Sequence, residues 1–224
     1  MVNREVVLLL LDSDAARKLC QFDLIEFLLT SIQFKATDLG VLPQLKFQLH
    51  LNDEKKAEKK LGSRHAFENA KNLASSAFEV EVSADSANPI LELDRPDLET
   101  GELTLFAALS ETEESHLLSG DKRAYIALSK VDQLDEIHEL WPRFLCLEEA
   151  ILIIIAHHDF DAISERVRSD PDVDTAVALT FGVSAPSSKE NVEGALTSYV
   201  NHLQQQTAGR FIPITNPGKA FQIQ

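Results

Sequence analysis

Cysteine, long apolar runs and basic residues are all scarce in this chain of 224 residues. Cys20 and Cys146 are the only cysteines and form no CxxC motif or zinc-binding pattern, which predicts a reducing compartment without disulfides. No apolar run reaches the roughly 18 residues that a membrane span needs. The first apolar run stops at Asp12 and has no cleavage site of a secretory signal. We therefore expect a cytoplasmic protein without a membrane partner.

Positive charge is also in short supply. Lys and Arg number 21 against 36 Asp and Glu, which gives a formal net charge of −15. This charge argues against nucleic-acid binding over the whole surface, although it does not exclude a local basic patch. The densest basic run, residues 55–60, alternates with Glu54 and Glu58 and is interpreted as the solvated face of a helix. The length suits one large domain, or one domain with an extension.

Short apolar runs that end in acids or turn residues predict buried strands. Unbroken runs of this kind are typical of strands covered on both faces, as in a parallel sheet. A further segment, Phe78 to Val82, alternates apolar and acidic residues and predicts a half-exposed strand. The unbroken runs are Val6–Leu11, residues 117–118 and residues 144–147, with a shorter extended segment at residues 41–43 after a turn at residues 37–40.

Helical spacing of apolar residues fills the intervals between these strands. Helices are predicted at residues 15–30, 43–49, 53–77 (with a break near Gly62-Ser63), 97–110, 122–131 and 150–157. The alternation through residue 157 predicts an α/β fold with a mainly parallel central sheet flanked by helices. Residues 158–209 then predict a C-terminal helical extension packed on the domain of residues 1–157, and residues 210–224 a tail. A capping box from Ser187 to Glu190 is predicted to begin the last helix.

Two of the predicted strands end in acids. Asp12 follows the first strand, and Asp121 follows the strand at residues 117–118. The carboxyl ends of parallel strands are where open α/β sheets place ligands. Clustered carboxylates repel one another unless a proton or a hard cation such as Mg²⁺ or Mn²⁺ balances them. Each acid also has a simpler interpretation, because Asp12, Asp14 and Asp121 all stand where a helix cap is favoured.

Several motifs in a fixed order resemble the PIN-like domain family. They are Leu8-Leu9-Leu10-Leu11-Asp12-Ser13-Asp14, Gly101-Glu102-Leu103, Leu117-Leu118-Ser119-Gly120-Asp121-Lys122-Arg123 and Phe144-Leu145-Cys146-Leu147-Glu148-Glu149. In that family a hydrophobic first strand ends in an acid, a GE turn opens a later helix, and a (T/S)GD(K/R) turn follows the next strand. The resemblance spans about residues 5–155. It implies a PIN-like fold.

PIN-like domains are generally metal-dependent nucleases that act mostly on RNA. The resemblance implies that Asp12, Glu102 and Asp121 bind Mg²⁺ or Mn²⁺, with Asp14 as a further candidate ligand. The metal would bind the scissile phosphate of an RNA substrate and activate a water for attack. Glu102 is otherwise an ordinary acid in the first turn of a helix.

The chain departs from the family pattern at one position. The family usually has another acid in the second helical segment, where this sequence has Gln44 and Gln48. An amide oxygen is neutral, so such a site would bind a metal more weakly. Asp14, Asp38 or Glu148 is a candidate substitute, although Glu148 also suits the first turn of a helix. The pair His157-His158 stands at a predicted helix end and is interpreted as helix-terminal rather than metal-binding.

Three functions remain open at this stage. The first is a metal-dependent endoribonuclease, and the second is a catalytically inactive PIN-like interaction module. The inactive module would bind a protein partner or a second copy through its C-terminal helices. A third is a phosphate-transferring fold with Asp12 as nucleophile and Ser119 and Lys122 at later strand ends. Lys122 and Arg123 are either phosphate contacts or solvated cations, and solvation is favoured.

Overall fold

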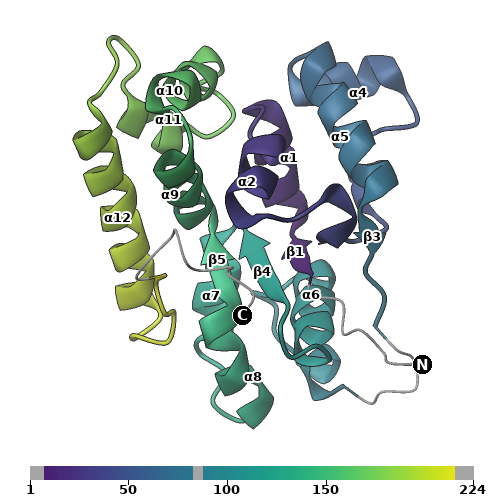
Figure 1. Ribbon diagram of the computed structural model, residues 1–224. Coiled ribbons are helices and arrows are strands. Elements are labelled where there is room, and N and C mark those ends of the chain that lie inside the picture. The colour runs from purple at the N-terminus through teal and green to yellow at the C-terminus, as the bar shows by residue number, and fades with distance from the viewer. Residues whose placement is uncertain (1–7, 83–87, 215–224) are drawn as a thin grey trace.

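The computed structural model describes residues 8–82 and 88–214. Within these ranges five strands form one all-parallel sheet in the order β3-β2-β1-β4-β5 (Figure 1). The α/β fold with a parallel sheet flanked by helices is therefore confirmed, while Val6 and Val7 of the first predicted strand lie outside the described residues. The strands are β1 (Leu9–Leu11), β2 (Leu39–Val41), β3 (Phe78–Glu79), β4 (His116–Ser119) and β5 (Phe144–Cys146).

The sheet separates two apolar cores. Successive side chains of the first strand point to opposite faces, so Leu9 and Leu11 belong to one core and Leu8 and Leu10 to the other. This double burial explains why the segment carries no polar residue until Asp12. The first core is covered by α1 (Ser13–Gln21), α2 (Ile25–Ile32), α4 (Glu54–Leu61), α5 (Arg64–Ser76) and α9 (Leu147–His157), and the second by α6 (Thr100–Ser110), α7 (Lys122–Leu128) and α8 (Asp135–Leu140).

The helices after residue 157 pack on this framework. They are α10 (Phe160–Ser169), α11 (Thr175–Phe181) and α12 (Lys189–Gln206), and the last contacts both α9 and α7. Val192 and Leu196 join the first core and Val200 and Leu203 the second, so α12 runs along the β5 side of the molecule (Figure 1). The predicted capping box is wrong by one residue. Ser188 caps α12 by accepting a hydrogen bond from the Asn191 N–H.

Two local predictions fail for reasons of tertiary packing. The single helix predicted at 15–30 is two helices, because Asp23 adopts a left-handed conformation (φ 57°) between them. Its carboxylate accepts hydrogen bonds from Asn69 and Arg166, which are distant in the sequence. The turn predicted at 37–40 is also wrong in part, since a short 3₁₀ helix, η1 (Ala36–Asp38), leads directly into β2.

The predicted break between two helices at Gly62-Ser63 is confirmed. Gly62 ends α4 with φ +83°, a backbone conformation that glycine adopts without strain. Ser63 then caps α5 by accepting a hydrogen bond from the Ala66 N–H. The remaining short elements are α3 (Leu45–Gln48), η2 (Pro89–Glu92) and η3 (Trp141–Arg143). None of the helices in the described part of the chain has the length and apolarity to cross a membrane.

Candidate functional site

The two strands that end in acids lie next to each other. Leu11 of β1 pairs with Leu118 of β4, so both strands reach the same edge of the sheet. From β1 the order runs outward to β2 and β3 on one side and to β4 and β5 on the other. The boundary between β1 and β4 is therefore the topological switch point, where open α/β sheets form ligand-binding crevices. Asp12 and Asp121 stand at this boundary, as predicted.

Asp12 joins the two strand ends. It caps α1 by accepting a hydrogen bond from the Ala15 N–H (2.5 Å), and its other oxygen accepts hydrogen bonds from the Gly120 N–H (3.1 Å) and the Ser119 hydroxyl. Burial raises the pKa of Asp12 above its usual value, although these hydrogen bonds oppose the shift. The cap interpretation is thus correct for Asp12. Ser119 is the last residue of β4, and Gly120 follows it. The Asp12 carboxylate therefore also connects the end of β1 to the end of β4.

Asp121 has a different environment. It caps α7 by accepting a hydrogen bond from the Arg123 N–H (2.9 Å), and the Arg123 guanidinium contacts both carboxylate oxygens, the shortest contact being 2.5 Å. This guanidinium lowers the pKa of Asp121. The backbone N–H of Asp121 also donates to the Ser119 hydroxyl (3.0 Å). Ser119 therefore links the two acids, a role that sequence reasoning missed although the residue belongs to the SGDKR motif.

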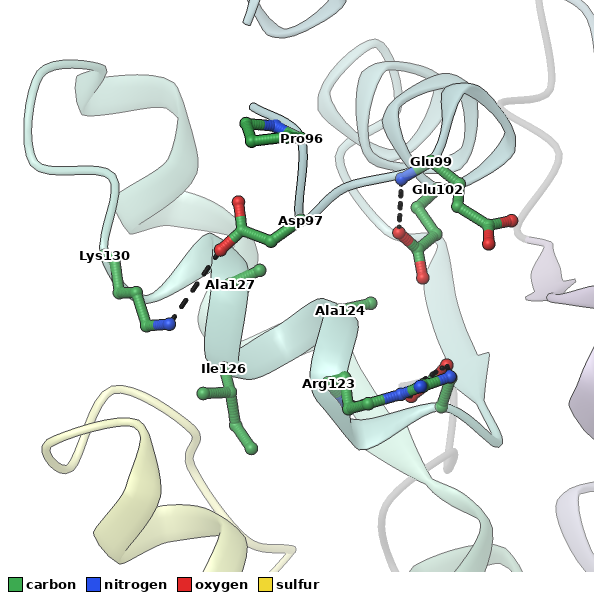
Figure 2. Close-up of a pocket in the computed structure, with 10 residues that line it drawn as sticks. Pro96, Asp97, Glu99, Glu102, Arg123, Ala124, Ile126, Ala127 and Lys130 are labelled. Atoms are coloured by element: carbon green, nitrogen blue, oxygen red, sulfur yellow. Dashed lines mark hydrogen bonds and ion pairs between the residues drawn. The ribbon is translucent and has the colours of Figure 1, made fainter. Parts of the chain in front are cut away.

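Glu102 is the third predicted acid, and it comes from the start of α6. Its carboxylate accepts a hydrogen bond from the Glu99 N–H (2.7 Å), closing the first turn of the helix (Figure 2). Burial raises the pKa of Glu102, and the neighbouring carboxylates of Asp121, Glu99 and Asp12 raise it further. Glu102 thus lies near the two acids that follow β1 and β4, and Ser119 links those two acids to each other.

Asp14 is close to the same turn but is already neutralised. It forms ion pairs with Arg17 (2.6 Å) and Lys18 (2.7 Å), and Lys18 also contacts Asp174 (2.8 Å). A Cβ at Gly120 would collide with the Asp14 carboxylate, so the glycine permits this close approach. With two cations on it, Asp14 is a weaker candidate ligand than Asp12.

The remaining candidates from the sequence have structural partners. Glu148 is buried and forms an ion pair with Lys122, whose ammonium also lies 5.3 Å from the Tyr199 ring centroid. Lys122 is therefore held by α9 and α12, and the interpretation of a solvated cation is wrong for it. Gln44 lies beside α6, because a Cβ at Gly101 would be 3.5 Å from its side-chain nitrogen. A neutral amide thus lies beside Gly101, the residue before Glu102.

A cavity of about 390 Å³ opens beside Glu102 and Asp121. Figure 2 shows Glu99, Glu102 and Arg123 toward one side of it, Asp97 and Lys130 toward the other, and Ala124 and Ala127 between them. Asp121, which pairs with Arg123, also lines the cavity. Small-molecule sites typically enclose about 300 to 1,000 Å³. The volume and the perturbed carboxylates make this cavity the candidate functional site.

The carboxylates of the cavity have the chemistry that a hard cation requires, but they are not already arranged as a metal site. Carboxylate oxygens are the ligands that Mg²⁺ and Mn²⁺ prefer, and the pKa of Glu102 is raised first by burial and then by the neighbouring carboxylates. Among residues 8–82 and 88–214, no group of three His, Cys, Asp or Glu side chains is arranged to hold a metal. Arg123 forms an ion pair with Asp121, but the Arg123 side chain is 88% exposed and only lightly packed. Displacing Arg123 would free the Asp121 carboxylate for a cation.

Comparison of the chain with protein-family models, with curated proteins and with solved structures finds no match. The resemblance to PIN-like domains therefore stays a prediction that depends on the motifs and their order. The site geometry is the independent basis for a functional proposal.

Proposed function

We propose that this protein is a divalent-metal-dependent nuclease with a PIN-like fold and that it cleaves RNA. One observation carries the proposal: Glu102 and Asp121 line one cavity at the carboxyl edge of a parallel sheet, and Asp12 is hydrogen-bonded to Ser119 and Gly120, next to Asp121 in the chain. All three carboxylates also stand at helix N-termini, which in a parallel sheet begin at this same edge, so the proposal assigns them a role beyond capping. Their proximity costs electrostatic energy, which a bound cation would recover.

Each acid has a distinct part in this proposal. Glu102 and Asp121 line the cavity and would hold the cation, and Asp12 would complete the negative charge from the β1 side. Ser119 positions Asp12 and Asp121 through its two hydrogen bonds. A divalent ion bound there would supply Lewis-acid stabilisation of the phosphate and lower the pKa of a water. The cation would also reduce the local negative charge at the site, which otherwise repels a polyanionic substrate.

The proposal is tested by thermal denaturation with Mg²⁺ and Mn²⁺, followed by cleavage of a labelled single-stranded RNA. Metal at about 100 times its Kd stabilises the native state by about 2.7 kcal/mol, which raises the Tm of a chain of this size by about 5 to 10 °C. Glu102→Gln is the informative variant, because glutamine still accepts the hydrogen bond from the Glu99 N–H. The double variant Asp12→Asn, Asp121→Asn removes two of the three negative charges and should have the larger effect on metal binding.

Asp53→Asn provides the matched control, since Asp53 is a half-exposed cap of α4, outside the cavity lining. The proposal requires that metal raise the Tm of the wild type and of this control, that Glu102→Gln lose most of the rise, and that RNA cleavage follow the same order. An equal rise in all variants would mean general cation binding to an acidic surface. Metal binding without cleavage of RNA would also contradict the nuclease proposal.

The second candidate is a catalytically inactive PIN-like interaction module. The pairing of Asp121 with Arg123 favours it, as does the neutral Gln44 beside Gly101, where the family usually has an acid. In such a module the cation of Arg123 would take the permanent place of a metal. The absence of any metal-dependent change in Tm at millimolar Mg²⁺ and Mn²⁺ would favour this candidate.

A further inference from the structure

The sheet ends in a strand that is paired on one side only. β3 lies at the outer end of the sheet and pairs with β2, and no segment among residues 8–82 and 88–214 pairs with its other side (Figure 1). Both residues of β3, Phe78 and Glu79, are exposed. An edge strand with unpaired N–H and C=O groups is a template on which another extended chain can pair.

The hydrogen bonds of the ladder show which backbone groups face outward. The N–H of Val80 donates to the carbonyl oxygen of Val41 in β2 (2.9 Å), so Val80 directs its N–H toward the sheet. Successive residues of a strand direct their N–H and C=O groups to opposite sides. The N–H and C=O groups of Glu79 therefore point away from β2, where an added strand would bind them.

The side chains of this edge alternate in chemistry. Val80 is buried in the second core, whereas Glu79 and Glu81 on either side of it are exposed. Phe78 is two residues before Val80, so it belongs to the same face of the sheet, and it is 56% exposed. A strand added here would place every second side chain beside Phe78 and the others beside the two glutamates.

A second exposed aromatic residue comes from the neighbouring helix. Phe47 of α3 is 70% exposed, and Phe47 and Phe78 are the most exposed phenylalanines of the described residues. Lys46, which precedes Phe47, forms an ion pair with Glu79, so α3 lies next to β3. Aromatic rings supply much of the binding energy of protein interfaces. This edge of the sheet thus combines outward backbone groups with two apolar anchors.

We propose that β3 binds an extended basic segment of another protein, which pairs with its outer side as a further strand of the sheet. In this segment lysine or arginine would alternate with apolar residues. The apolar side chains would contact Phe78, and the cations would face Glu79 and Glu81. β3 contributes no residue to the cavity beside Glu102, so the inference does not rest on the proposed function.

Charge complementarity selects this partner. Lys46 compensates Glu79, but no ion pair joins Glu81 to a described residue, so the edge keeps a net negative charge. The net charge of −15 on the whole chain also steers a cationic partner toward the protein. A second copy of this chain fits less well, because pairing of two β3 edges would bring glutamates opposite glutamates, and like charges directly opposite are destabilising.

The test is binding of a fluorescein-labelled octapeptide of alternating lysine and valine to the intact chain, measured by fluorescence anisotropy. A peptide of the same composition, with its lysines and valines in two blocks, is the control for general attraction to an acidic protein. We expect the alternating peptide to bind more tightly than the block peptide. We also expect it to slow the amide hydrogen exchange of Glu79, followed by NMR, because an N–H that joins a ladder is protected.

Two variants separate the backbone from the charge. Glu79→Pro removes the outward N–H, which an edge strand tolerates, so binding should be lost. Glu79→Gln keeps this N–H and should retain most of the binding. Glu81→Lys sets a cation against the lysines of the peptide and should weaken binding about five-fold or more. Glu165→Lys makes the same change of charge at an exposed position of α10 and should bind as the wild type does.

Several results would overturn the inference. Equal binding of the two peptides, or equal weakening by Glu81→Lys and Glu165→Lys, would mean general electrostatic attraction. Unchanged binding by Glu81→Lys, or unchanged exchange at Glu79 in the complex, would place the peptide elsewhere. Protection of Glu79 that depends on protein concentration without peptide would show that a second copy occupies the edge. If Glu79→Pro lowers the Tm strongly, Glu81→Lys and the exchange of Glu79 decide. Selective binding of the alternating peptide, with Glu79 protected and binding weakened in Glu81→Lys alone of the two lysine variants, supports the inference.

Discussion

Glu149 is the acid whose replacement has the most definite consequence for stability. It lies in the first turn of α9 with only 3% of its surface exposed. Its carboxylate accepts hydrogen bonds from the N–H groups of Cys146 (3.0 Å) and Ile214 (2.8 Å). Burial raises the pKa of Glu149 from its ordinary 4.5 to about 7, and the charge of Glu148 adds to the shift. The two hydrogen bonds only partly oppose this rise in the pKa of Glu149.

This pKa makes the stability of the native state depend on pH. The native protein keeps a proton on Glu149 up to about pH 7, whereas the unfolded chain releases it near 4.5. The resulting stabilisation is complete below the unfolded pKa and is lost as the pH rises through 7. A shift of this size corresponds to about 3 kcal/mol over the full window, and to about 2 kcal/mol between about pH 5.5 and pH 8.5.

Glu149→Gln removes the titrating group but keeps a hydrogen-bond acceptor. We therefore expect its free energy of unfolding, relative to the wild type, to increase by about 2 kcal/mol between pH 5.5 and pH 8.5. Trp141 is the only tryptophan of the chain and is buried. Urea unfolding followed by its fluorescence measures the difference in free energy of unfolding between variant and wild type at both pH values. The lower pH stays above the sequence pI of about 4.8, where the protein would be least soluble.

The matched control is Glu165→Gln, which removes one negative charge from an exposed position of α10. Its difference from the wild type should be nearly the same at both pH values. If Glu149→Gln shows the same pH-independent difference, Glu149 is ionised in the native state throughout this range. The reasoning from burial would then be refuted.

Two further predictions concern packing around the sheet. Tyr125→Phe removes a completely buried hydroxyl that hydrogen-bonds to the carbonyl oxygens of Leu117 (3.1 Å) and Leu145 (2.9 Å). We expect this variant to lower the free energy of unfolding by about 1 to 2 kcal/mol. An unchanged urea midpoint would contradict this prediction. Gly40→Ala places a Cβ 2.6 Å from a methyl carbon of Leu10 and should cost about 1 to 3 kcal/mol through overpacking, seen as a lower Tm. A Tm equal to or above that of the wild type would show that Leu10 can move aside.

The sequence predicts elements well wherever burial alone decides them. The strands β1, β4 and β5 are short apolar runs because both of their faces are covered, and such runs are visible without any knowledge of the fold. The turn predicted at residues 37–40 includes Leu39 and Gly40 of β2, because glycine is typical of turns, whereas the predicted extended segment begins only at Val41. A glycine is needed at position 40 because side chains of Leu10 and Val80 occupy the space of a Cβ. That reason lies in neighbouring strands, so no local pattern reveals it.

The site was predictable in its acids but not in their partners. Asp12 follows its apolar run directly, and Asp121 follows its own after Ser119 and Gly120, so their position at strand ends is visible in the sequence. The ion pair between Lys122 and Glu148 is not, because it depends on how α7 packs beside α9. The contact of Asp121 with Arg123 depends on a choice of rotamer at the surface. Which acids are neutralised, and hence which could bind a metal, therefore requires the structure.

The functional proposal depends most on strand order, which the sequence does not specify. A parallel sheet needs only that each crossover connection pack on one face, and many orders satisfy this condition. If β2 or β5 stood between β1 and β4, Asp12 could not accept hydrogen bonds from Ser119 and Gly120. The link that Ser119 makes between Asp12 and Asp121 requires the same adjacency. The placement of these two acids at one edge of the sheet is thus a property of the tertiary fold, and it is independent of the motif resemblance that first suggested them.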